Sequence, residues 1–290
     1  MNLQKLKQEK TTEELLEFGI INIDKSTGPT SFNVSQFVKR KLGIKKTSHL
    51  GTLDPKVTGV LPVTLNRACK ISGYLMSHDK TYVGIMRFHE DISKIKIEEA
   101  IKKKFLGEIT QLPPLKSRVK RAERQRTIHT FKILEKTGTD FLIETKVQGG
   151  TYIRKLIHDL GEELGIGAHM LELRRTQAGI FDESTIVRLY DFEKAVDEYK
   201  AGNDKALREM ITPAEIITEF YPIIQIKESE VKRLFTGQPL QKEDLVEKEK
   251  FDKDQKIIAF HKNKFIGIYN VINEKEIFAK AEFIFQPIEN

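Results

Sequence analysis

Residues 48–63 read SHLGTLDPKVTGVLPV, and this stretch decides how the rest of the chain is interpreted. It places one acid, Asp54, in a tight loop that Gly51, Pro55 and Gly59 constrain. An apolar run follows at once and predicts a buried anchor for the loop. A loop held by buried flanks can position a catalytic side chain accurately. The same residues also fit a plain Asp-Pro turn, in which the carboxylate hydrogen-bonds its own backbone.

Composition narrows the class of protein. The chain has 290 residues, which is enough for one large domain and a small one. Its 49 Lys and Arg against 42 Asp and Glu give a net charge of +7, which favours a polyanionic partner. The single cysteine, Cys69, excludes an internal disulfide framework and fits a reducing cytoplasm. No apolar run predicts a membrane span or a signal peptide, so we expect a cytoplasmic protein with no membrane partner.

The acid loop resembles a known family signature. His49, GTLDP at residues 51–55 and TGVLP at residues 58–62 are similar to the signature of the tRNA pseudouridine synthase B family. The form DPKVTG resembles the archaeal and eukaryotic branch of that family, the dyskerin-like enzymes of box H/ACA guide-RNA particles. The resemblance implies that Asp54 is the catalytic residue. Family members usually have Gly before the His and Ser or Thr after it, whereas this chain has Ser48 and Leu50 there.

Two further strings extend the resemblance. DKSTGPTS at residues 24–31 lacks the G-x-x-x-x-G-K-[ST] order of a nucleotide triphosphatase, and it resembles the first motif of the family, with Ser26 in place of the usual Pro. The residues from Lys80 onward have strand composition, which puts Lys80 and Tyr82 on the same face, and a tyrosine in a strand is most often a packing residue. The K-x-Y string there resembles the second motif, which implies that Tyr82 stacks on the target base. The resemblance also implies that Lys25 supports the acid loop and that His49 helps to flip the base.

The segment after residue 150 predicts a helix whose buried face repeats at helical spacing from Ile153 to Leu164. Arg154 falls in the first turn, where the helix dipole disfavours a cation, so a carboxylate partner is expected. Here the string GTYIR resembles the family motif whose Arg pairs with the catalytic acid. We therefore predict an ion pair between Arg154 and Asp54 that keeps the acid ionised and aimed. Farther on, Leu173 matches the apolar residue that lines the uracil pocket of the family, and the string GAHM before it is typical of the guide-RNA branch.

Two basic stretches are candidates for contacts with an RNA backbone. The first follows a predicted helix that Ser31 can cap and that Gly43 ends, and the second contains two prolines that make it extended and stiff. The candidate phosphate-binding residues are Lys39, Arg40, Lys45, Lys46, Lys116, Arg118, Lys120, Arg121, Arg124 and Arg126. Such charges hold phosphates without reading sequence. A simple solvated face is the alternative for the first stretch.

The resemblance implies an α+β architecture: a pseudouridine synthase fold, with a mixed and largely antiparallel sheet, flanking helices and a catalytic cleft. We expect a flexible N-terminal arm over residues 1–17 and a catalytic domain over residues 18–218. Residues 221–290 resemble a PUA domain, a small β-barrel-like module that binds RNA, and we expect a turn there at Lys262 and Asn263.

The implied activity is that of an isomerase that converts uridine to pseudouridine, either in the tRNA T-loop or at rRNA sites that a guide RNA selects. Asp54 would act as a nucleophile or as a base, and the sequence leaves this choice open. We expect RNA as the partner, with small accessory proteins of the NOP and GAR types. No cofactor is expected, and one Cys with scattered His residues predicts no metal site. A non-catalytic RNA-binding scaffold that retains the fold is the alternative.

Overall fold

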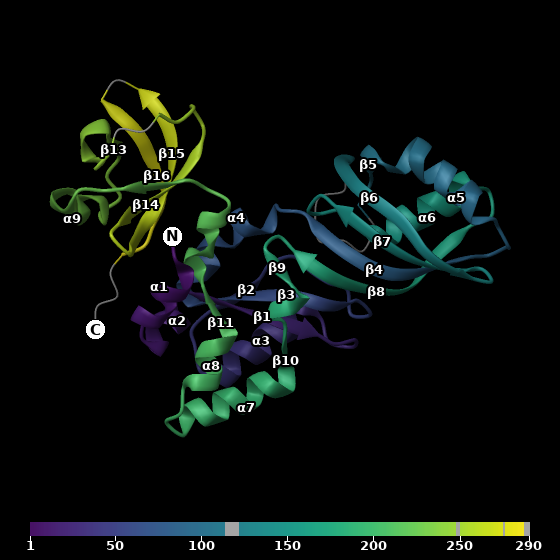
Figure 1. Cartoon of the computed structure of the whole chain (residues 1–290), viewed down its shortest axis with the longest axis horizontal. Helices are drawn as coiled ribbons and strands as arrows, with labels where there is room; N and C mark the ends of the chain where they lie inside the picture. The colour runs from purple at the N-terminus through teal and green to yellow at the C-terminus, as the bar shows by residue number, and fades with distance from the viewer. Residues whose placement is uncertain (114–121, 248–249, 275, 287–290) are drawn as a thin grey trace. The chain divides into compact units, whose positions relative to one another are not determined.

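The computed structural model describes residues 1–113, 122–247, 250–274 and 276–286 (Figure 1). The chain forms two compact units. The smaller comprises Met1–Ile20, Asn66–Ile71 and Thr212–Asn290, and the larger comprises Ile21–Leu65 and Ser72–Ile211. Some predicted RNA-contacting residues lie outside the described residues, namely Lys116, Arg118, Lys120 and Arg121.

A mixed sheet runs through the larger unit in the order β10-β1-β3-β8-β4-β7-β6-β5, with β2 paired to β3 and β9 to β8. Its strands are β1 (Gly19–Lys25), β2 (Thr47–His49), β3 (Thr58–Leu65), β4 (Lys80–Phe88), β5 (Gly107–Gln111), β6 (Arg124–Thr137), β7 (Asp140–Val147), β8 (Ala168–Ala178), β9 (Phe181–Asp182) and β10 (Val187–Arg188). β4 is antiparallel to β7 and β8, β6 is antiparallel to β5 and β7, and β3 is parallel to β8. The predicted mixed, largely antiparallel sheet is confirmed.

The central strand β4 shows how a period of two gives the sheet its faces. Every second residue of this strand, beginning with Lys80, is buried. Tyr82 shares that buried face with Lys80, as the alternation predicted. In the pairing of β4 with β8, Arg175 lies opposite Tyr82 and Leu173 lies opposite Gly84. The register therefore gathers chemically distinct side chains from two strands on one face.

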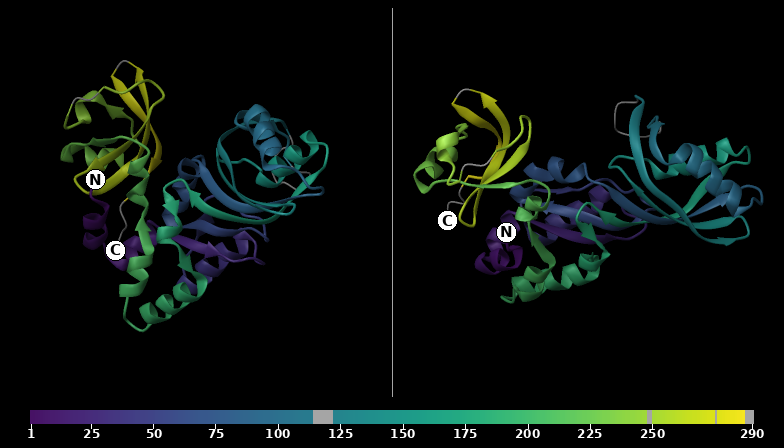
Figure 2. Two further views of the ribbon diagram at one scale, coloured as in Figure 1. Left: turned by 45° about the vertical axis from the view of Figure 1, so that its right-hand side comes forward. Right: turned by 45° about the horizontal axis from the view of Figure 1, so that its top comes forward.

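The helices of the larger unit are α3 (Ser31–Leu42), α4 (Ser72–Met76), α5 (Lys94–Ala100), α6 (Ile153–Glu163), α7 (Leu189–Lys200) and α8 (Lys205–Met210), with a π turn at Ile101–Phe105 and a 3-10 turn at Glu183–Thr185. α6 packs on β8 within the curve of the sheet (Figure 2). No helix in the described parts of the chain is both long enough and apolar enough to cross a membrane.

The capping of α3 differs from the sequence prediction. The N-cap is Thr30, whose side chain accepts a hydrogen bond from the Asn33 amide at 3.1 Å. The expectation that Ser31 caps this helix was wrong, because Ser31 is the first helical residue and is fully buried. At the other end, Gly43 adopts the left-handed conformation with φ 70°, as a C-terminal glycine should.

The N-terminal residues differ from the expected flexible arm, because they form the helices α1 (Leu3–Glu9) and α2 (Thr12–Glu17). α2 begins with a capping box in which Thr11 and Glu14 each bond the backbone of the other. Leu15 is 0% exposed and Leu6 is 4% exposed, so the two helices contribute to the core of the smaller unit. Burial of these leucines supplies the free energy that short helices lack in isolation.

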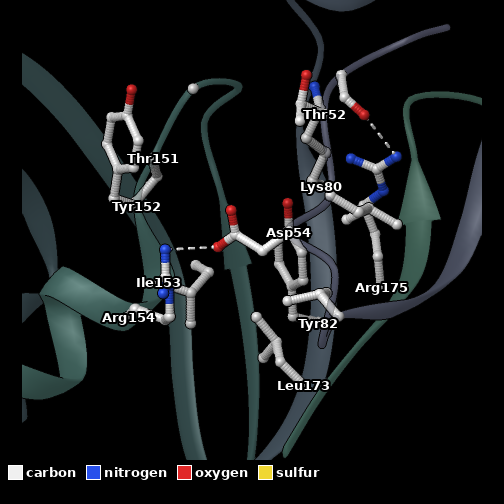
Figure 3. A pocket seen from close by; sticks show the side chains of 14 residues that line it. Thr52, Asp54, Lys80, Tyr82, Thr151, Tyr152, Ile153, Arg154, Leu173 and Arg175 are labelled. Carbon is white, nitrogen blue, oxygen red and sulfur yellow. Dashed lines mark hydrogen bonds and ion pairs between the residues drawn. The ribbon is translucent and has the colours of Figure 1, made fainter. Parts of the chain in front are cut away.

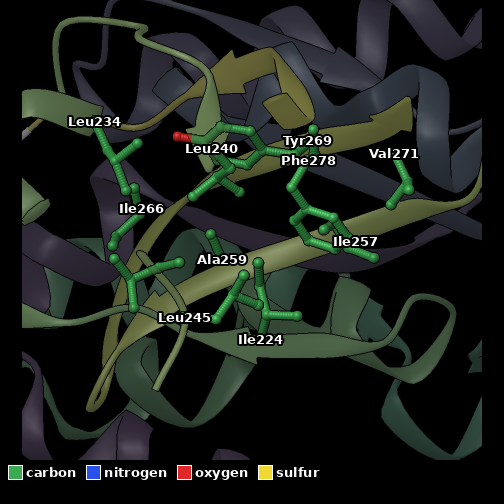
Figure 4. Packing of buried hydrophobic residues seen from close by; sticks show 12 residues of the cluster. Ile224, Leu234, Leu240, Leu245, Ile257, Ala259, Ile266, Tyr269, Val271 and Phe278 are labelled. Carbon is green, nitrogen blue, oxygen red and sulfur yellow. The ribbon is translucent and has the colours of Figure 1, made fainter. Parts of the chain in front are cut away.

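The C-terminal part of the smaller unit is a sheet in the order β12-β14-β15-β16-β13. β11 (Ile211–Pro213) belongs to the main sheet, where it pairs with β1. The remaining elements are β12 (Ile223–Gln225), α9 (Val231–Leu234), β13 (Leu240–Gln241), β14 (Lys256–His261), β15 (Lys264–Glu274) and β16 (Ile277–Ile284), with 3-10 turns at Asn66–Ile71, Ala214–Glu219, Glu228–Glu230 and Lys242–Asp244. An apolar cluster that includes Ile257, Ile266 and Phe278 forms the hydrophobic core of this sheet (Figure 4). The predicted turn at Lys262 is confirmed, with φ 54°.

Candidate functional site

The acid loop connects β2 to β3 and is held by buried polar groups. Lys25 is fully buried, and its ammonium donates hydrogen bonds to the backbone oxygens of Ser26 (3.0 Å), Pro55 (3.1 Å) and Val57 (2.8 Å). Burial lowers the pKa of Lys25, and the nearby charge of Asp54 acts in the opposite direction. The geometry is that of a lysine which supports the acid loop from beneath.

Ser31 and Gly59 also fix the loop. The Ser31 hydroxyl accepts a hydrogen bond from the Leu53 amide at 2.8 Å and lies 3.0 Å from the Leu53 carbonyl oxygen. Gly59 has φ 100°, and a Cβ atom there would come within 2.2 Å of the Arg175 carbonyl oxygen. Only glycine allows this close approach of β3 to β8. The loop is therefore fixed before Asp54 by the bond of Ser31 to Leu53 and after it by the close approach at Gly59.

Asp54 and Arg154 form the predicted ion pair. The Oδ2 atom of Asp54 lies 2.8 Å from a terminal guanidinium nitrogen of Arg154 (Figure 3). The side chains are 45% and 59% exposed, respectively. A pair this exposed contributes little to folding stability, so its consequence is mainly to aim the carboxylate. Arg154 reaches the acid because it stands in the first turn of α6, beside the loop.

A cavity of about 230 Å³ surrounds Asp54. It is lined by Gly51, Thr52, Leu53, Asp54, Val57, Lys80, Tyr82, Gly150, Thr151, Tyr152, Ile153, Arg154, Leu173 and Arg175. Asp54 lies between Arg154 on one side and Tyr82 on the other, with Leu173 next to the tyrosine ring (Figure 3). The structure thus brings together four of the predicted site residues from four separate parts of the sequence: the acid loop, β4, α6 and β8.

The sequence analysis did not identify Arg175 as a site residue. This side chain is 1% exposed, and it donates hydrogen bonds to the backbone oxygens of Val60 (2.8 Å) and Gly51 (3.0 Å). Burial lowers the pKa of Arg175, and the nearby Tyr82 side chain acts in the opposite direction. The neighbouring Arg174 points the other way and pairs with carboxylates, among them Asp24. Two adjacent residues of a strand face opposite sides, so the neighbouring arginines would have been the signal had a strand been predicted there.

Lys80 was noted only for sharing a face with Tyr82, yet it also lines the cavity. It is 6% exposed, and its ammonium donates to the backbone oxygens of Met76 (2.8 Å) and His78 (2.7 Å). Burial lowers the pKa of Lys80 to about 8, with a smaller contribution in the same direction from Arg175.

His49, expected to help flip the base, lies at the end of β2 and is not among the residues that line the cavity. Its Nε2 atom is 3.2 Å from the hydroxyl of Thr52, which does line the cavity. Burial lowers the pKa of His49, and the charge of Arg175 adds to that effect. His49 therefore stands one contact behind the cavity surface.

The predicted phosphate-binding residues that the structure describes are spread over the larger unit. Lys39 and Arg40 belong to the last turn of α3, and Lys45 and Lys46 are exposed in the segment before β2. Arg124 and Arg126 lie at the start of β6. The Arg126 guanidinium passes close to Gly150, and a Cβ atom on that glycine would lie 3.2 Å from it. Of these residues, Arg126 is therefore placed next to a residue that lines the cavity.

A metal ion or cofactor would need a suitable set of ligands. Within the described ranges, no group of three or more His, Cys, Asp or Glu side chains is arranged to hold a metal ion. The cavity instead offers one carboxylate, three cationic side chains and two tyrosine rings. This set can bind and polarise a planar organic group.

Comparison with known proteins identifies the family. Residues 39–153 match the family described as TruB family pseudouridylate synthase (N terminal domain), and residues 154–219 match the tRNA pseudouridylate synthase B C-terminal domain. The chain is 45% identical over 244 residues to the probable tRNA pseudouridine synthase B of Methanopyrus kandleri, covering 84% of this chain and 72% of the relative. It is 46% identical over 234 residues to the protein of the same name from Pyrococcus horikoshii, covering 79% and 69%.

Solved structures agree with this assignment. A chain of the "Crystal Structure of a Cbf5-Nop10-Gar1 Complex" matches with a TM-score of 0.88 at 36% identity, covering 97% of this chain and 89% of that one. A chain of the "Structure of H/ACA RNP bound to a substrate RNA containing 2'-deoxyuridine" matches with a TM-score of 0.86 at 34% identity, covering 97% and 89%. With its acid loop, its fold and these relatives in agreement, the chain belongs to the TruB family of pseudouridylate synthases.

Proposed function

We propose that this chain is an RNA pseudouridine synthase, an isomerase that converts uridine to pseudouridine within structured RNA. The observation that carries the proposal is the ion pair of Asp54 with Arg154 in a cavity that Tyr82 and Leu173 also line. A reactive carboxylate beside an aromatic ring and an apolar wall suits a planar base held against its sugar. The small volume of the cavity favours a single base over a larger ligand.

The chemistry needs no second substrate. The N1–C1′ bond of the uridine breaks, the base turns in place, and C5 forms a new bond to C1′. The proton leaves C5, and N1 gains one. Since substrate and product contain the same atoms, neither an oxidant nor a group donor is consumed.

The cavity residues have distinct roles in this proposal. The target base leaves its stack and enters the cavity, where Tyr82 provides a platform and Leu173 an apolar wall. Asp54 attacks the sugar or the base, or removes a proton, and Arg154 holds its carboxylate in place. Lys25 supports the acid loop, and His49 helps to hold the RNA while the base is turned out.

The RNA backbone would be held by basic side chains that do not themselves line the cavity. Those that support this part of the proposal are Lys39, Arg40, Lys45, Lys46, Arg124 and Arg126. Residues 221–290 would act as a PUA domain that binds a structured part of the RNA, next to a catalytic domain over residues 18–218. Several neutralised phosphates make binding weaken steeply as salt rises.

Two ways of choosing the substrate remain within this proposal. The curated relatives carry the name of a tRNA enzyme, which supports direct recognition of the tRNA T-loop. The matching structures are assemblies of Cbf5 with Nop10 and Gar1 and a particle with substrate RNA, which support an archaeal-type guided enzyme with small accessory proteins. The single cysteine supports work in a reducing compartment such as the cytoplasm.

The test is pseudouridine formation by the purified protein. One reaction contains a tRNA T-loop substrate alone, and a parallel reaction contains an H/ACA guide RNA, its target and accessory proteins of the NOP and GAR types. Product in the first reaction identifies an enzyme that recognises tRNA directly, and product only in the second identifies a guided enzyme. Absence of product in both, with RNA binding retained, would favour the non-catalytic scaffold.

A further inference from the structure

Two buried cations line the side of the cavity that lies away from Arg154 (Figure 3). Lys80 is 6% exposed and Arg175 is 1% exposed. Their hydrogen-bond acceptors are backbone carbonyl oxygens. Atoms of both cations lie close to Gly51, since a Cβ atom there would be 3.2 Å from Arg175 and 3.3 Å from Lys80. The two positive charges therefore stand behind the same turn of the acid loop.

No carboxylate among the described residues forms an ion pair or hydrogen bond with either cation. Asp79 influences Lys80 electrostatically, but its own carboxylate oxygens are 3.1 Å from His129 and 3.8 Å from the Lys146 ammonium. Asp54, the acid that lines the cavity, pairs with Arg154. Buried charges without a carboxylate partner are costly to keep in a fold. Hydrogen bonds to backbone carbonyl groups do not explain why the fold keeps these two charges buried, so we expect a functional role for Lys80 and Arg175.

We propose that Lys80 and Arg175 form a fixed positive wall that stabilises negative charge on the uracil base during the reaction. This inference rests on the proposed function. When the N1–C1′ bond breaks, its electron pair stays on the base. The carboxylate of Asp54 stabilises the electron-deficient C1′ atom of the sugar. Until C5 gives an electron pair to the new bond, the base carries the charge. Preorganised charges in a partly dry cavity are effective at such a point, because they need no rearrangement.

The link from Arg175 to Tyr82 strengthens the assignment. The tyrosine on which the base is expected to stack lies opposite Arg175 in the pairing of β4 with β8, and its side chain opposes the lowering of the Arg175 pKa by burial. The positive potential is therefore directed at the ring platform and not only at the acid loop. Arg175 keeps its proton across the neutral range, so its charge is constant.

Lys80, in contrast, titrates within the pH range in which enzyme activity can be measured. Burial lowers its pKa to about 8, Arg175 acts in the same direction, and Asp79 opposes both. Lys80 is charged below this pH and loses its charge as the pH rises through it. The rate of the chemical step should therefore fall on the alkaline side, at or somewhat above pH 8, because bound polyanionic RNA favours the charged form.

The experiment measures single-turnover pseudouridine formation between about pH 6 and pH 9.5 for the wild type and two variants. We expect Lys80→Met to be slower by roughly 10²-fold at neutral pH, which is the scale for one preorganised electrostatic group. Its profile should be flat, so that its deficit narrows as the wild type loses the Lys80 charge. Lys80→Arg should keep part of the rate and lack the alkaline fall, since arginine does not titrate in this range.

Lys25→Met is the matched control. Lys25 is also a buried lysine that donates to backbone carbonyls, but it does not line the cavity. That variant should be slower and still show the alkaline fall. RNA affinity at neutral pH shows whether each variant is folded.

The outcomes separate the inference from the function on which it rests. An alkaline fall that is unchanged in Lys80→Arg would overturn the inference alone, and so would a Lys80→Met deficit that is equal at every pH. A wild type that makes no pseudouridine from any RNA tested would overturn the proposed function together with the inference.

Discussion

The two sides of the cavity around Asp54 are built in different ways. On the open side, the Asp54 and Arg154 side chains are about half exposed and satisfy each other as an ion pair. On the closed side, Lys80, Tyr82 and Arg175 are buried and are fixed by the pairing of β4 with β8. The open side can exchange contacts with an incoming RNA, whereas the closed side cannot move without breaking the sheet. Reactivity is thus placed on an adjustable loop, and the charge behind it is placed on a rigid sheet.

Removal of the acid on the open side should have the largest effect. We expect Asp54→Asn to abolish pseudouridine formation and to keep RNA affinity within a few-fold, since the amide has the shape of the carboxylate without its charge. Single-turnover assays and filter binding check this. Asp24→Asn is the control, because Asp24 pairs with Arg174 and does not line the cavity. Substantial turnover by Asp54→Asn would show that Asp54 is not the catalytic residue.

Loss of the partner of that acid should come next. Arg154→Met should lower the single-turnover rate by roughly 10²- to 10³-fold, because the carboxylate loses the charge that aims it. Arg154→Lys should recover part of the loss, as it keeps the charge without the planar fork. Thermal unfolding should change little in either variant, because an exposed ion pair contributes little to stability. A large fall in melting temperature would show that the pair is structural.

The tyrosine on the closed side should give a smaller loss. Tyr82→Phe keeps the ring and removes the hydroxyl, which lies near Arg175 and influences its pKa. We expect a rate lower by about 10²-fold if that group handles a proton or relays charge. Tyr82→Leu, which removes the platform as well, should be slower still. Equal rates for Tyr82→Phe and the wild type would show that Tyr82 serves only as a stacking surface. They would also weaken the proposed difference between the open and closed sides of the cavity.

The smallest effect should come from His49, behind the cavity. Burial lowers the pKa of His49 in the folded state, so the folded protein binds this proton less readily than the unfolded chain. This histidine therefore contributes stability above its unfolded pKa, and that contribution is lost as the pH falls through its folded pKa. His49→Gln should lessen the fall in unfolding free energy from pH 7 towards pH 5. Denaturant titrations at several pH values check this, and an unchanged slope would contradict it.

Local features of the fold could be predicted from the sequence because they depend on near neighbours. The alternation along β4, the apolar face of α6 and the turn at Lys262 follow from residues a few positions apart. The pairing of Asp54 with Arg154 joins residues a hundred positions apart, and it was predicted only because the motifs around both resemble one family. The helix cap at Thr30 was missed, because two adjacent hydroxyl residues are equally suitable in sequence.

The sequence by itself determined the acid loop, the strand that carries Tyr82 and the helix that carries Arg154, because glycine positions, period and helix spacing are local properties. Only the tertiary structure decided that Arg175 faces the cavity while Arg174 faces the other way, and that Leu15 is buried. Which of two neighbouring arginines points inward depends on the register of β8 against its partner strands. That register is set by long-range packing, which no short stretch of sequence contains.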